Sequence, residues 1–190
     1  MLALCLAAAA GGVASHVLYF NRGEHHLWAV IYIQLFSVAC LSAIVGLVNF
    51  YDYRALLAIA ATTTVAASFL VGVWTSLIIY RAFLSPLCKF PGPFLARISS
   101  LWLTFTVAPK LNGYHTFQAL HEKYGAYVRI GPDTLSVSDA DLHEQAFGHN
   151  TKFRKAIWYD GNKPYDSIHT TRDKALHDRR RRMWVPAFSK

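Results

Sequence analysis

The sequence predicts a mainly α-helical chain with one small β-hairpin, held in a membrane by its N-terminal helices. Three observations predict this class: long apolar segments without charge, a change in charge near residue 80, and a Gly-Pro-Asp turn between two alternating stretches. Residues 1–80 contain equal numbers of acidic and basic side chains, namely Arg22, Glu24, Asp52 and Arg54. The formal net charge of +8 therefore belongs to the residues after 80. Such a break separates a segment suited to lipid from one suited to water.

Two apolar segments are long enough to cross a bilayer as helices. Leu27–Val48 has Gln34 as its one strongly polar side chain, and Leu56–Tyr80 carries no charge. Each exceeds the roughly 20 residues that cover a hydrocarbon core. A helix satisfies its own backbone hydrogen bonds, so it is the expected state of both segments in lipid. We therefore predict that residues 1–80 form a membrane anchor of two to three transmembrane helices.

The first apolar segment, Met1–Phe20, has two interpretations. It is long enough to span a bilayer, although Gly11, Gly12, Ser15 and His16 dilute its apolar character. A cleaved signal peptide is the alternative, but such a peptide normally has basic residues before its apolar run, and this segment has none. The pattern favours a retained third span.

The residues that follow the last apolar segment predict a connector and an orientation. Residues 81–93 include three prolines and a glycine, which prevent a continuing helix, so this stretch is expected to be a stiff Pro-rich hinge. Arg81, Lys89 and Arg97 follow Tyr80 with no acidic residue between them. The positive-inside rule then places the soluble part in the cytoplasm.

Three local elements are expected in the first half of the soluble part. Thr116–Tyr124 has helical spacing of apolar residues, and Gly125 suits the end of that helix. Two alternating stretches, 126–130 and 134–138, flank a Gly-Pro-Asp turn and predict a β-hairpin. Ser138 or Asp139 can then cap a short helix that runs through Phe147 to Gly148.

The second half of the soluble part is less regular. His149–Thr170 shows no periodicity, and a loop this long in a compact domain is usually functional. A last helix is expected to start at Thr170 or Thr171 and to run toward Trp184, with Pro186 close to its end. Two strands do not make an independently stable sheet, so the soluble part is expected to be the opening of a larger fold.

Several short motifs follow one another from Lys89 to the C-terminus. They are Lys89-Phe90-Pro91-Gly92-Pro93, Leu120-His121-Glu122-Lys123-Tyr124-Gly125, Val128-Arg129-Ile130-Gly131-Pro132, Phe153-Arg154-Lys155, Trp158-Tyr159-Asp160-Gly161, Thr170-Thr171-Arg172-Asp173 and Pro186-Ala187-Phe188-Ser189. In this order they resemble the N-terminal part of a fungal microsomal cytochrome P450 monooxygenase. The resemblance implies that residues 94–190 are a partial cytochrome P450 domain, from its first helices and β-hairpin through its third helix. It also implies an endoplasmic reticulum membrane, a lipophilic small-molecule substrate of fungal secondary metabolism, and electrons from NADPH-cytochrome P450 reductase.

The resemblance also implies site residues. In the family the third helix contacts haem, and its usual pattern places His177 and Arg181 on the haem propionates. The spacing agrees, because residues four apart share a helix face and a guanidinium can fork onto a carboxylate. The 149–170 loop covers the substrate pocket in the family. The resemblance therefore implies that Trp158, Tyr159, Tyr165 and Ile168 are candidates for substrate contact.

The family binds iron through a cysteine thiolate in a Phe- and Gly-rich loop, and no cysteine of this chain matches that loop. Cys5, Cys40 and Cys88 have other neighbours, and the helix that activates oxygen and the Glu-x-x-Arg helix are not matched either. The chain is therefore expected to be catalytically incompetent alone, as a truncated gene product or an incomplete gene model.

Two other classes of function remain open at this stage. A non-enzymatic membrane protein could use the domain remnant as a scaffold or regulatory partner. A basic multi-pass protein could bind anionic lipid or nucleic acid through the run Arg179–Arg182, with binding that weakens steeply with salt. Beside apolar spans and the motif order, a solvated helix face is the better interpretation of that run, so nucleic acid is not an expected partner. The adjacent pair His25-His26 could suggest a metal, but such pairs on an interfacial loop usually bind none, and His115, His121, His143 and His149 are dispersed, so no metal site is expected.

Overall fold

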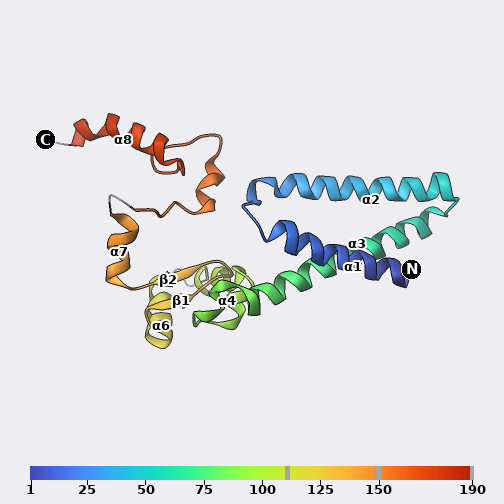
Figure 1. Cartoon of the computed structure of the whole chain (residues 1–190), viewed down its shortest axis with the longest axis horizontal. Coiled ribbons are helices and arrows are strands. Elements are labelled where there is room, and N and C mark those ends of the chain that lie inside the picture. Colours follow the sequence, from blue (N-terminus) through green and yellow to red (C-terminus); the bar gives the residue numbers. More distant parts are fainter. Residues whose placement is uncertain (110–111, 149–150, 189–190) are drawn as a thin grey trace. The chain divides into compact units, whose positions relative to one another are not determined.

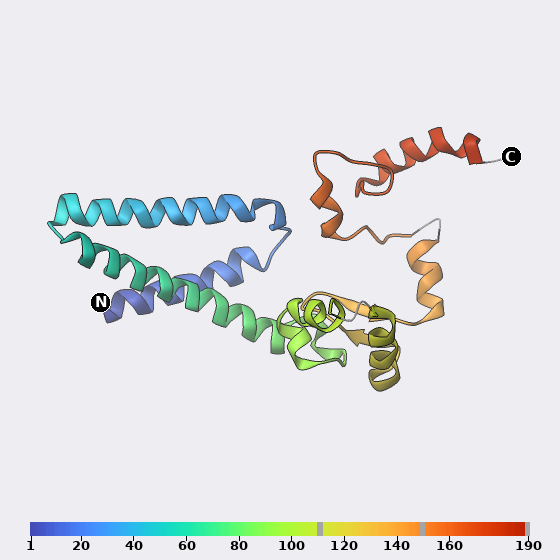
Figure 2. The ribbon, with the colours of Figure 1, turned by 180° about the vertical axis from the view of Figure 1, so that it is seen from behind.

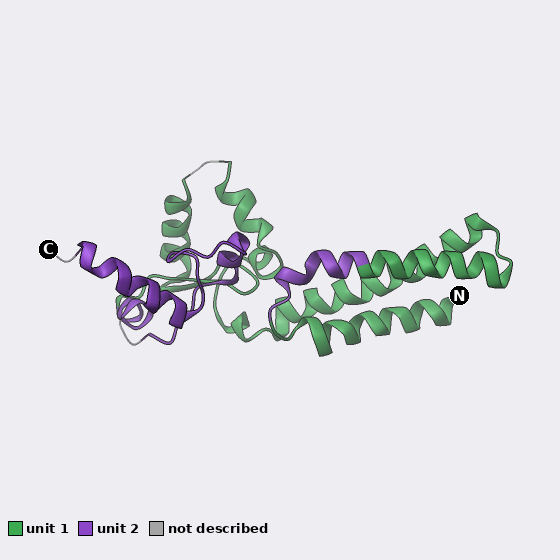
Figure 3. Cartoon of the chain, turned by 90° about the horizontal axis from the view of Figure 1, so that it is seen from above, with its two compact units in different colours: residues 1–23, 35–140 green, residues 24–34, 141–190 purple. Residues whose placement is uncertain are grey.

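The computed structural model describes residues 1–109, 112–148 and 151–188 (Figure 1). The chain is mainly helical and has one two-stranded antiparallel sheet, which confirms the predicted fold class. It divides into two compact units, coloured separately in Figure 3. Unit 1 comprises Met1–Gly23 and Leu35–Ala140, and unit 2 comprises Glu24–Gln34 and Asp141–Lys190.

Three helical segments are long and apolar enough to cross a membrane. They are Leu2–Phe20, His26–Tyr51 and Ala55–Leu84. The first consists of α1 (Leu2–Ser15) and a π-helical turn, and the third of α3 (Ala55–Ile79) and another π-helical turn. Between them, a 3-10 turn leads into α2 (Ala29–Tyr51). Helices thus occupy Leu27–Val48 and Leu56–Tyr80, the two segments that the sequence predicts to span a membrane, and they extend a few residues beyond the predicted bounds.

Helices α1 and α3 pack backbone against backbone within unit 1, and both views show them crossing (Figures 1 and 2). Gly12 and Gly72 are buried at the contact. A Cβ atom added at Gly12 would overlap the carbonyl oxygen of Phe69, and one added at Gly72 would overlap that of Ala9. Small residues allow such close approach between helices in lipid, where burial of apolar surface does not drive association. Helix α1 lies in Met1–Phe20, the segment for which the sequence allowed either a retained span or a cleaved signal peptide.

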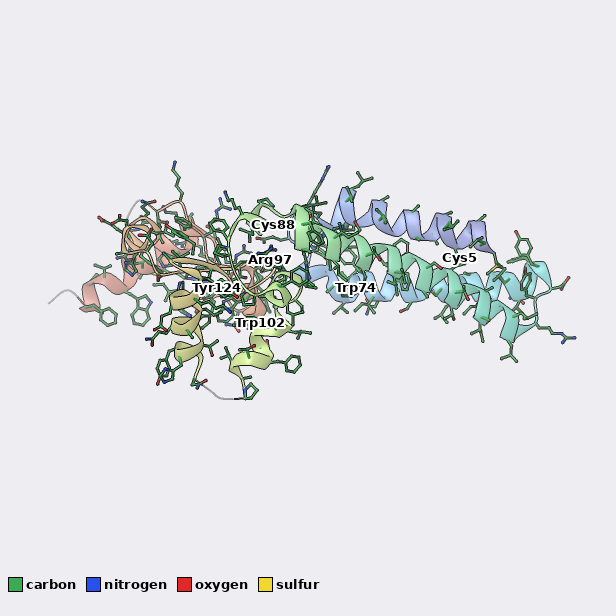
Figure 4. All side chains as sticks on the ribbon, turned by 90° about the horizontal axis from the view of Figure 1, so that it is seen from below. Cys5, Trp74, Cys88, Arg97, Trp102 and Tyr124 are labelled. Carbon is green, nitrogen blue, oxygen red and sulfur yellow. The ribbon has the colours of Figure 1, made fainter. Side chains whose placement is uncertain are left out.

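Helix α2 makes a looser contact with its neighbours. None of its residues is buried, and Phe36 stacks on Phe69 of α3 with ring centroids 6.0 Å apart. A groove of about 620 Å³ lies between the three helices, with small and apolar residues of α2 and α3 along it. Trp74 projects from α3 and Cys5 from α1 (Figure 4).

The Pro-rich connector contains one 3-10 turn, Pro86–Lys89. Proline at its first position is tolerated because that N–H would have no helical partner, and the Ser85 hydroxyl accepts a hydrogen bond from the N–H of Leu87 at 3.3 Å. Two short helices that the sequence analysis did not predict follow, α4 (Phe94–Ile98) and α5 (Leu101–Val107). Helix α6 (Gly113–Tyr124) then begins three residues earlier than predicted.

The predicted hairpin is confirmed. Strands β1 (Tyr127–Arg129) and β2 (Leu135–Val137) pair antiparallel, with Val128 opposite Ser136. Gly125 ends α6 at a φ of 93°, a conformation that favours glycine, as its position in the sequence predicted.

Unit 2 contains most of the remaining elements. Helix α7 (Ala140–Phe147) has the predicted end, and a 3-10 turn, Ile157–Asn162, interrupts the stretch that was expected to be irregular. The predicted start of that stretch, His149, lies outside the described residues. Helix α8 (Lys174–Phe188) carries Pro186 in its last turn, close to its end as predicted.

The predicted start of the last helix was wrong. Thr170 and Thr171 are buried in a turn, where the backbone N–H and hydroxyl of Thr170 bond the Ser167 side chain and the Thr171 N–H bonds the Ser167 carbonyl. The Asp173 carboxylate instead accepts hydrogen bonds from the N–H groups of Ala175 and Leu176, at 2.8 and 3.2 Å. Asp173 is therefore the cap, and the helix begins after it.

Candidate functional site

Helix α8 places the two predicted cofactor contacts one turn apart. His177 is half-buried, and its Nδ1 lies 3.2 Å from an oxygen of Asp178. Arg181 is exposed, and no ion pair or hydrogen bond is present for its guanidinium among the described residues. The spacing of four residues puts both side chains on one face of the helix, as predicted.

A shallow cavity of about 400 Å³ lies beside Arg181 in unit 2. Its other lining residues are apolar: Ile168, Trp184, Val185 and Phe188. A single cation at the edge of an apolar surface suits an amphiphilic molecule that carries a carboxylate on its rim. Of the predicted substrate contacts, Ile168 is the one that this cavity includes.

The other three predicted substrate contacts lie elsewhere on the 3-10 turn and the loop after it. The rings of Trp158 and Tyr159 stack with centroids 4.5 Å apart, and Tyr159 packs edge-on against His169 at 5.5 Å. Trp158 is 70% exposed and Tyr165 is 84% exposed. The structure therefore brings Ile168 to Arg181 and gives no shared cavity to Trp158, Tyr159 and Tyr165.

A second constellation in unit 2 was not predicted. The Arg172 guanidinium forks onto both carboxylate oxygens of Glu24, at 2.7 and 2.8 Å, and also reaches an oxygen of Asp160 at 2.5 Å. His26 Nε2 lies 3.0 Å from the same Asp160 oxygen, and Lys163 Nζ lies 3.0 Å from the other one. We call these five residues the ion-pair network.

The network shifts the pKa values of its members. The hydrogen bond from Lys163 lowers the pKa of Asp160 to about 2, with further lowering by Arg172 and His26 against the effect of burial. The hydrogen bond from Arg172 lowers the pKa of Glu24, and Glu24 and Asp160 together raise the pKa of Arg172. All the carboxylates of the network are thus held in their charged form.

The ligand atoms of Glu24, His26 and Asp160 lie within 4.8 Å of one another, a spacing that metals can use. Here Arg172 and Lys163 already neutralise both carboxylates. A metal would have to displace two cations, so the geometry describes an ion-pair network rather than a metal centre.

The three cysteines lie in unit 1. Cys5 and Cys40 belong to the apolar helices α1 and α2. The Cys88 thiol lies 3.3 Å from the carbonyl oxygen of Ala82 and accepts a contact from Nη1 of Arg129 at 3.5 Å. Cys88 is labelled in Figure 4, and its thiol contacts place it beside the π-helical turn that follows α3.

Arg129 is a buried residue with no carboxylate partner among the described residues. Its side chain is fully buried, and Nε and Nη2 donate to the carbonyl oxygens of Gly131 and Pro132 at 3.1 and 2.6 Å. Its backbone N–H donates to the carbonyl of Pro91 at 2.7 Å. Arg129 therefore joins the connector to the hairpin.

Comparison with known proteins finds relatives among fungal monooxygenases. The chain is 43% identical to the cytochrome P450 monooxygenase lcsK of Purpureocillium lilacinum, over 96% of this chain and 34% of the relative. It is 37% identical to the cytochrome P450 monooxygenase notG′ of Aspergillus versicolor, over 99% of this chain and 34% of the relative. It is 33% identical to tryprostatin B 6-hydroxylase of Aspergillus fumigatus, over 93% of this chain and 32% of the relative.

The chain spans about a third of the length of the curated relatives it matches. No family model matches it. No solved structure matches it either.

Proposed function

We propose that the chain is a member of the fungal cytochrome P450 monooxygenases, namely the N-terminal portion of a membrane-bound monooxygenase that oxidises a lipophilic small molecule in fungal secondary metabolism. One observation carries the proposal: identity of 33–43% to three monooxygenases extends over nearly the whole chain. Similarity that includes the apolar N-terminal segments indicates a shared anchor as well as a shared domain. One of these relatives is named tryprostatin B 6-hydroxylase.

The residues of α8 fit one edge of a haem site. Haem combines two propionates with a large apolar ring, and the cavity combines the Arg181 guanidinium with aromatic and aliphatic side chains. We assign His177 and Arg181 to the propionates, since both can donate hydrogen bonds to a carboxylate from one helix face. When bound, haem supplies the iron at which dioxygen is activated. The role of these two side chains is to bind and orient its rim.

The chain alone is proposed to be catalytically incompetent. The family uses a cysteine thiolate on the iron, which favours O–O cleavage. Cys5 and Cys40 lie in candidate membrane spans, and the Cys88 thiol is engaged by Arg129 and the Ala82 carbonyl. None of them belongs to unit 2, which holds His177 and Arg181.

Substrate contact is proposed for Ile168, Trp158, Tyr159 and Tyr165. Ile168 lines the same cavity as Arg181. The exposed rings of Trp158 and Tyr165 offer apolar surface that a lipophilic molecule or further protein could cover.

The proposed location is the endoplasmic reticulum membrane, with the soluble part in the cytoplasm. Three apolar helices support the membrane, and the basic residues Arg81, Lys89 and Arg97 after the last one support the orientation. That side also contains NADPH-cytochrome P450 reductase, the proposed electron donor. Complementary charge steers such encounters, and the basic face of α8 is a candidate surface for it.

A chimera tests the proposal. This chain would replace the matching third of the Purpureocillium lilacinum relative, and the purified chimera would be assayed for bound haem and for the spectrum of its reduced, CO-bound form. We expect a thiolate-type Soret band from the chimera and none from the 190-residue chain expressed with haem. His177→Ala and Arg181→Ala in the chimera should lower haem content, whereas Arg179→Ala on the same helix should not.

Two outcomes would contradict the proposal. A chimera that folds in the membrane but contains no haem would favour the alternative, a non-enzymatic scaffold or regulatory remnant. A thiolate-type band from the 190-residue chain alone would overturn the proposed incompetence.

A further inference from the structure

The ion-pair network joins two segments that are far apart in the sequence. Glu24 lies in the loop between the first and second apolar helices and His26 is the first residue of the second, whereas Asp160, Lys163 and Arg172 lie after the third. Both segments belong to unit 2. Arg172 makes contacts with Glu24 across 148 positions of the chain, and His26 bonds Asp160 across 134.

Asp160 is the centre of the network. Its side chain is 3% exposed, and both of its oxygens are bonded to cationic or imidazole groups. A buried carboxylate is stable only when it is paired in this way. Arg172 also donates from Nε to the carbonyl of Lys155 at 3.0 Å. The guanidinium of Arg172 thus bonds both Lys155 and Asp160 within the segment 155–172.

The network is balanced in charge. Arg172 and Lys163 carry two positive charges, and Glu24 and Asp160 carry two negative ones. Removing Glu24 leaves Arg172 with Asp160 as its carboxylate partner, and leaves His26 as the remaining contact from the segment before α2 to Asp160. The bidentate geometry at Glu24 makes this the most directional contact between the two segments.

We propose that Glu24 and His26 form a membrane-side brace, which positions the segment 155–172 and requires that this segment and the loop at 21–26 share one face of the membrane. A side chain cannot reach another across a hydrocarbon core of roughly 30 Å. Helices α2 and α3 then cross as a hairpin whose loop, with Asp52 and Arg54, lies on the opposite face. This inference is independent of haem and of the proposed reaction.

Amide hydrogen exchange of the full chain in lipid nanodiscs tests the brace. Glu24→Gln should accelerate exchange severalfold in 155–172 and leave the hairpin strands of unit 1 unchanged. Asp52→Asn is the matched control, because it neutralises a carboxylate in the other loop between apolar helices and should change neither segment. Arg172→Lys keeps the charge but loses the fork, and should give an intermediate acceleration. Unchanged exchange in 155–172 on Glu24→Gln would overturn the brace.

Thiol labelling in sealed microsomes tests the shared face. Single cysteines would be introduced as Asn21→Cys, Arg54→Cys and Lys174→Cys in a background in which Cys5, Cys40 and Cys88 are replaced by serine, and exposed to a membrane-impermeant maleimide. We expect Asn21→Cys and Lys174→Cys to react from the same side, and Arg54→Cys only after the vesicles are opened. Reaction of Asn21→Cys and Lys174→Cys from opposite sides would overturn the inference.

Discussion

Units 1 and 2 are stabilised by different kinds of contact. Every buried hydrophobic residue among those the structure describes lies in unit 1: Ala58, Ala82, Ala96, Val128 and Ile130. The buried residues described in unit 2 are all polar: Asp160, Thr170 and Thr171. Unit 1 combines close packing and backbone approach with two buried polar side chains, His16 and Arg129, whereas unit 2 depends on paired charges and hydroxyl groups.

The two kinds of contact predict that different conditions and substitutions destabilise each unit. Close packing is disrupted by added volume and is indifferent to salt. Ion pairs at a half-exposed site are weakened by salt, since the Debye length falls from about 10 Å at 0.1 M to about 3 Å at 1 M. We expect high salt and low pH to loosen unit 2 first, while substitutions of small residues affect unit 1 most.

The largest effect is expected at the contact between α1 and α3. Gly12→Leu would force a side chain into the Phe69 carbonyl, and backbone on both sides leaves no room to adjust. Overpacking of this kind costs about 3 kcal/mol. The measurement is thermal unfolding in detergent followed by circular dichroism, with protease resistance of α1 as a second readout.

Gly11→Leu is the control for this substitution, because a Cβ atom at Gly11 meets nothing within 4 Å. It changes the same helix by the same volume at the adjacent position. Equal effects of the two substitutions would show that α1 does not depend on α3, and would reopen the signal-peptide interpretation of Met1–Phe20.

The next effect is expected at Arg129. Arg129→Met would leave the carbonyls of Gly131 and Pro132 without their donor in a buried site, at a cost of about 1–3 kcal/mol. Arg129→Lys restores a charge but not the fork, so its stability should lie between those of Met and Arg. Exchange of the connector and hairpin amides would measure the change. Faster exchange in unit 2 alone would contradict the assignment of Arg129 to unit 1.

The features predicted correctly depend on local information. A transmembrane helix needs only length and absence of charge, and a hairpin needs only alternation around a turn. Gly125 ends α6 because a residue with φ of 93° favours glycine. The change in charge near residue 80 separates an apolar part of the sequence from a charged part. The two units are defined by which residues contact one another, so their boundaries differ from it.

The features that were missed depend on contacts across the chain. The charges of Arg22 and Glu24 cancel in the sequence, which hid the pairing of Glu24 with Arg172. Arg129 follows an alternating strand pattern, and nothing near it indicates burial. Helices α4 and α5 are only five and seven residues long, too short for a clear periodicity. The start of α8 was missed because Asp173, two residues after Thr171, caps the helix in place of either threonine.

A pH titration tests the contribution of paired charges to the stability of unit 2. The folded pKa of Asp160 is lowered from 3.8 to about 2. The network's contribution to stability is therefore complete above about 3.8 and is lost as pH falls toward 2. Pepsin cleavage of 155–172 in this range should rise as pH falls, while the spans and hairpin of unit 1 resist.

Asp160→Asn should remove most of that pH dependence and leave the segment open at every pH in the range. Glu24→Gln isolates the contribution of Glu24, whose pKa is also lowered. An unchanged pH profile in Asp160→Asn would contradict the central place of Asp160 in the network.

The smallest effect is expected from the polar pair inside the α1–α3 contact. His16 is buried, its Nδ1 lies 2.9 Å from the Ser76 hydroxyl, and its ring packs edge-on against Tyr80 at 5.9 Å. Hydrogen bonds between membrane helices contribute on average about 0.6 kcal/mol, so Ser76→Ala should lower stability by that amount. Ser68→Ala on the same helix is the control, since the Ser68 hydroxyl bonds only the Thr64 carbonyl of its own helix. If the two substitutions lower the unfolding midpoint equally, the glycine contact alone holds α1, and unit 1 is a packed unit without a polar contribution from this pair. A larger loss in Ser76→Ala would show that the contact between α1 and α3 uses a buried polar pair, in addition to close packing, to set the register of its helices.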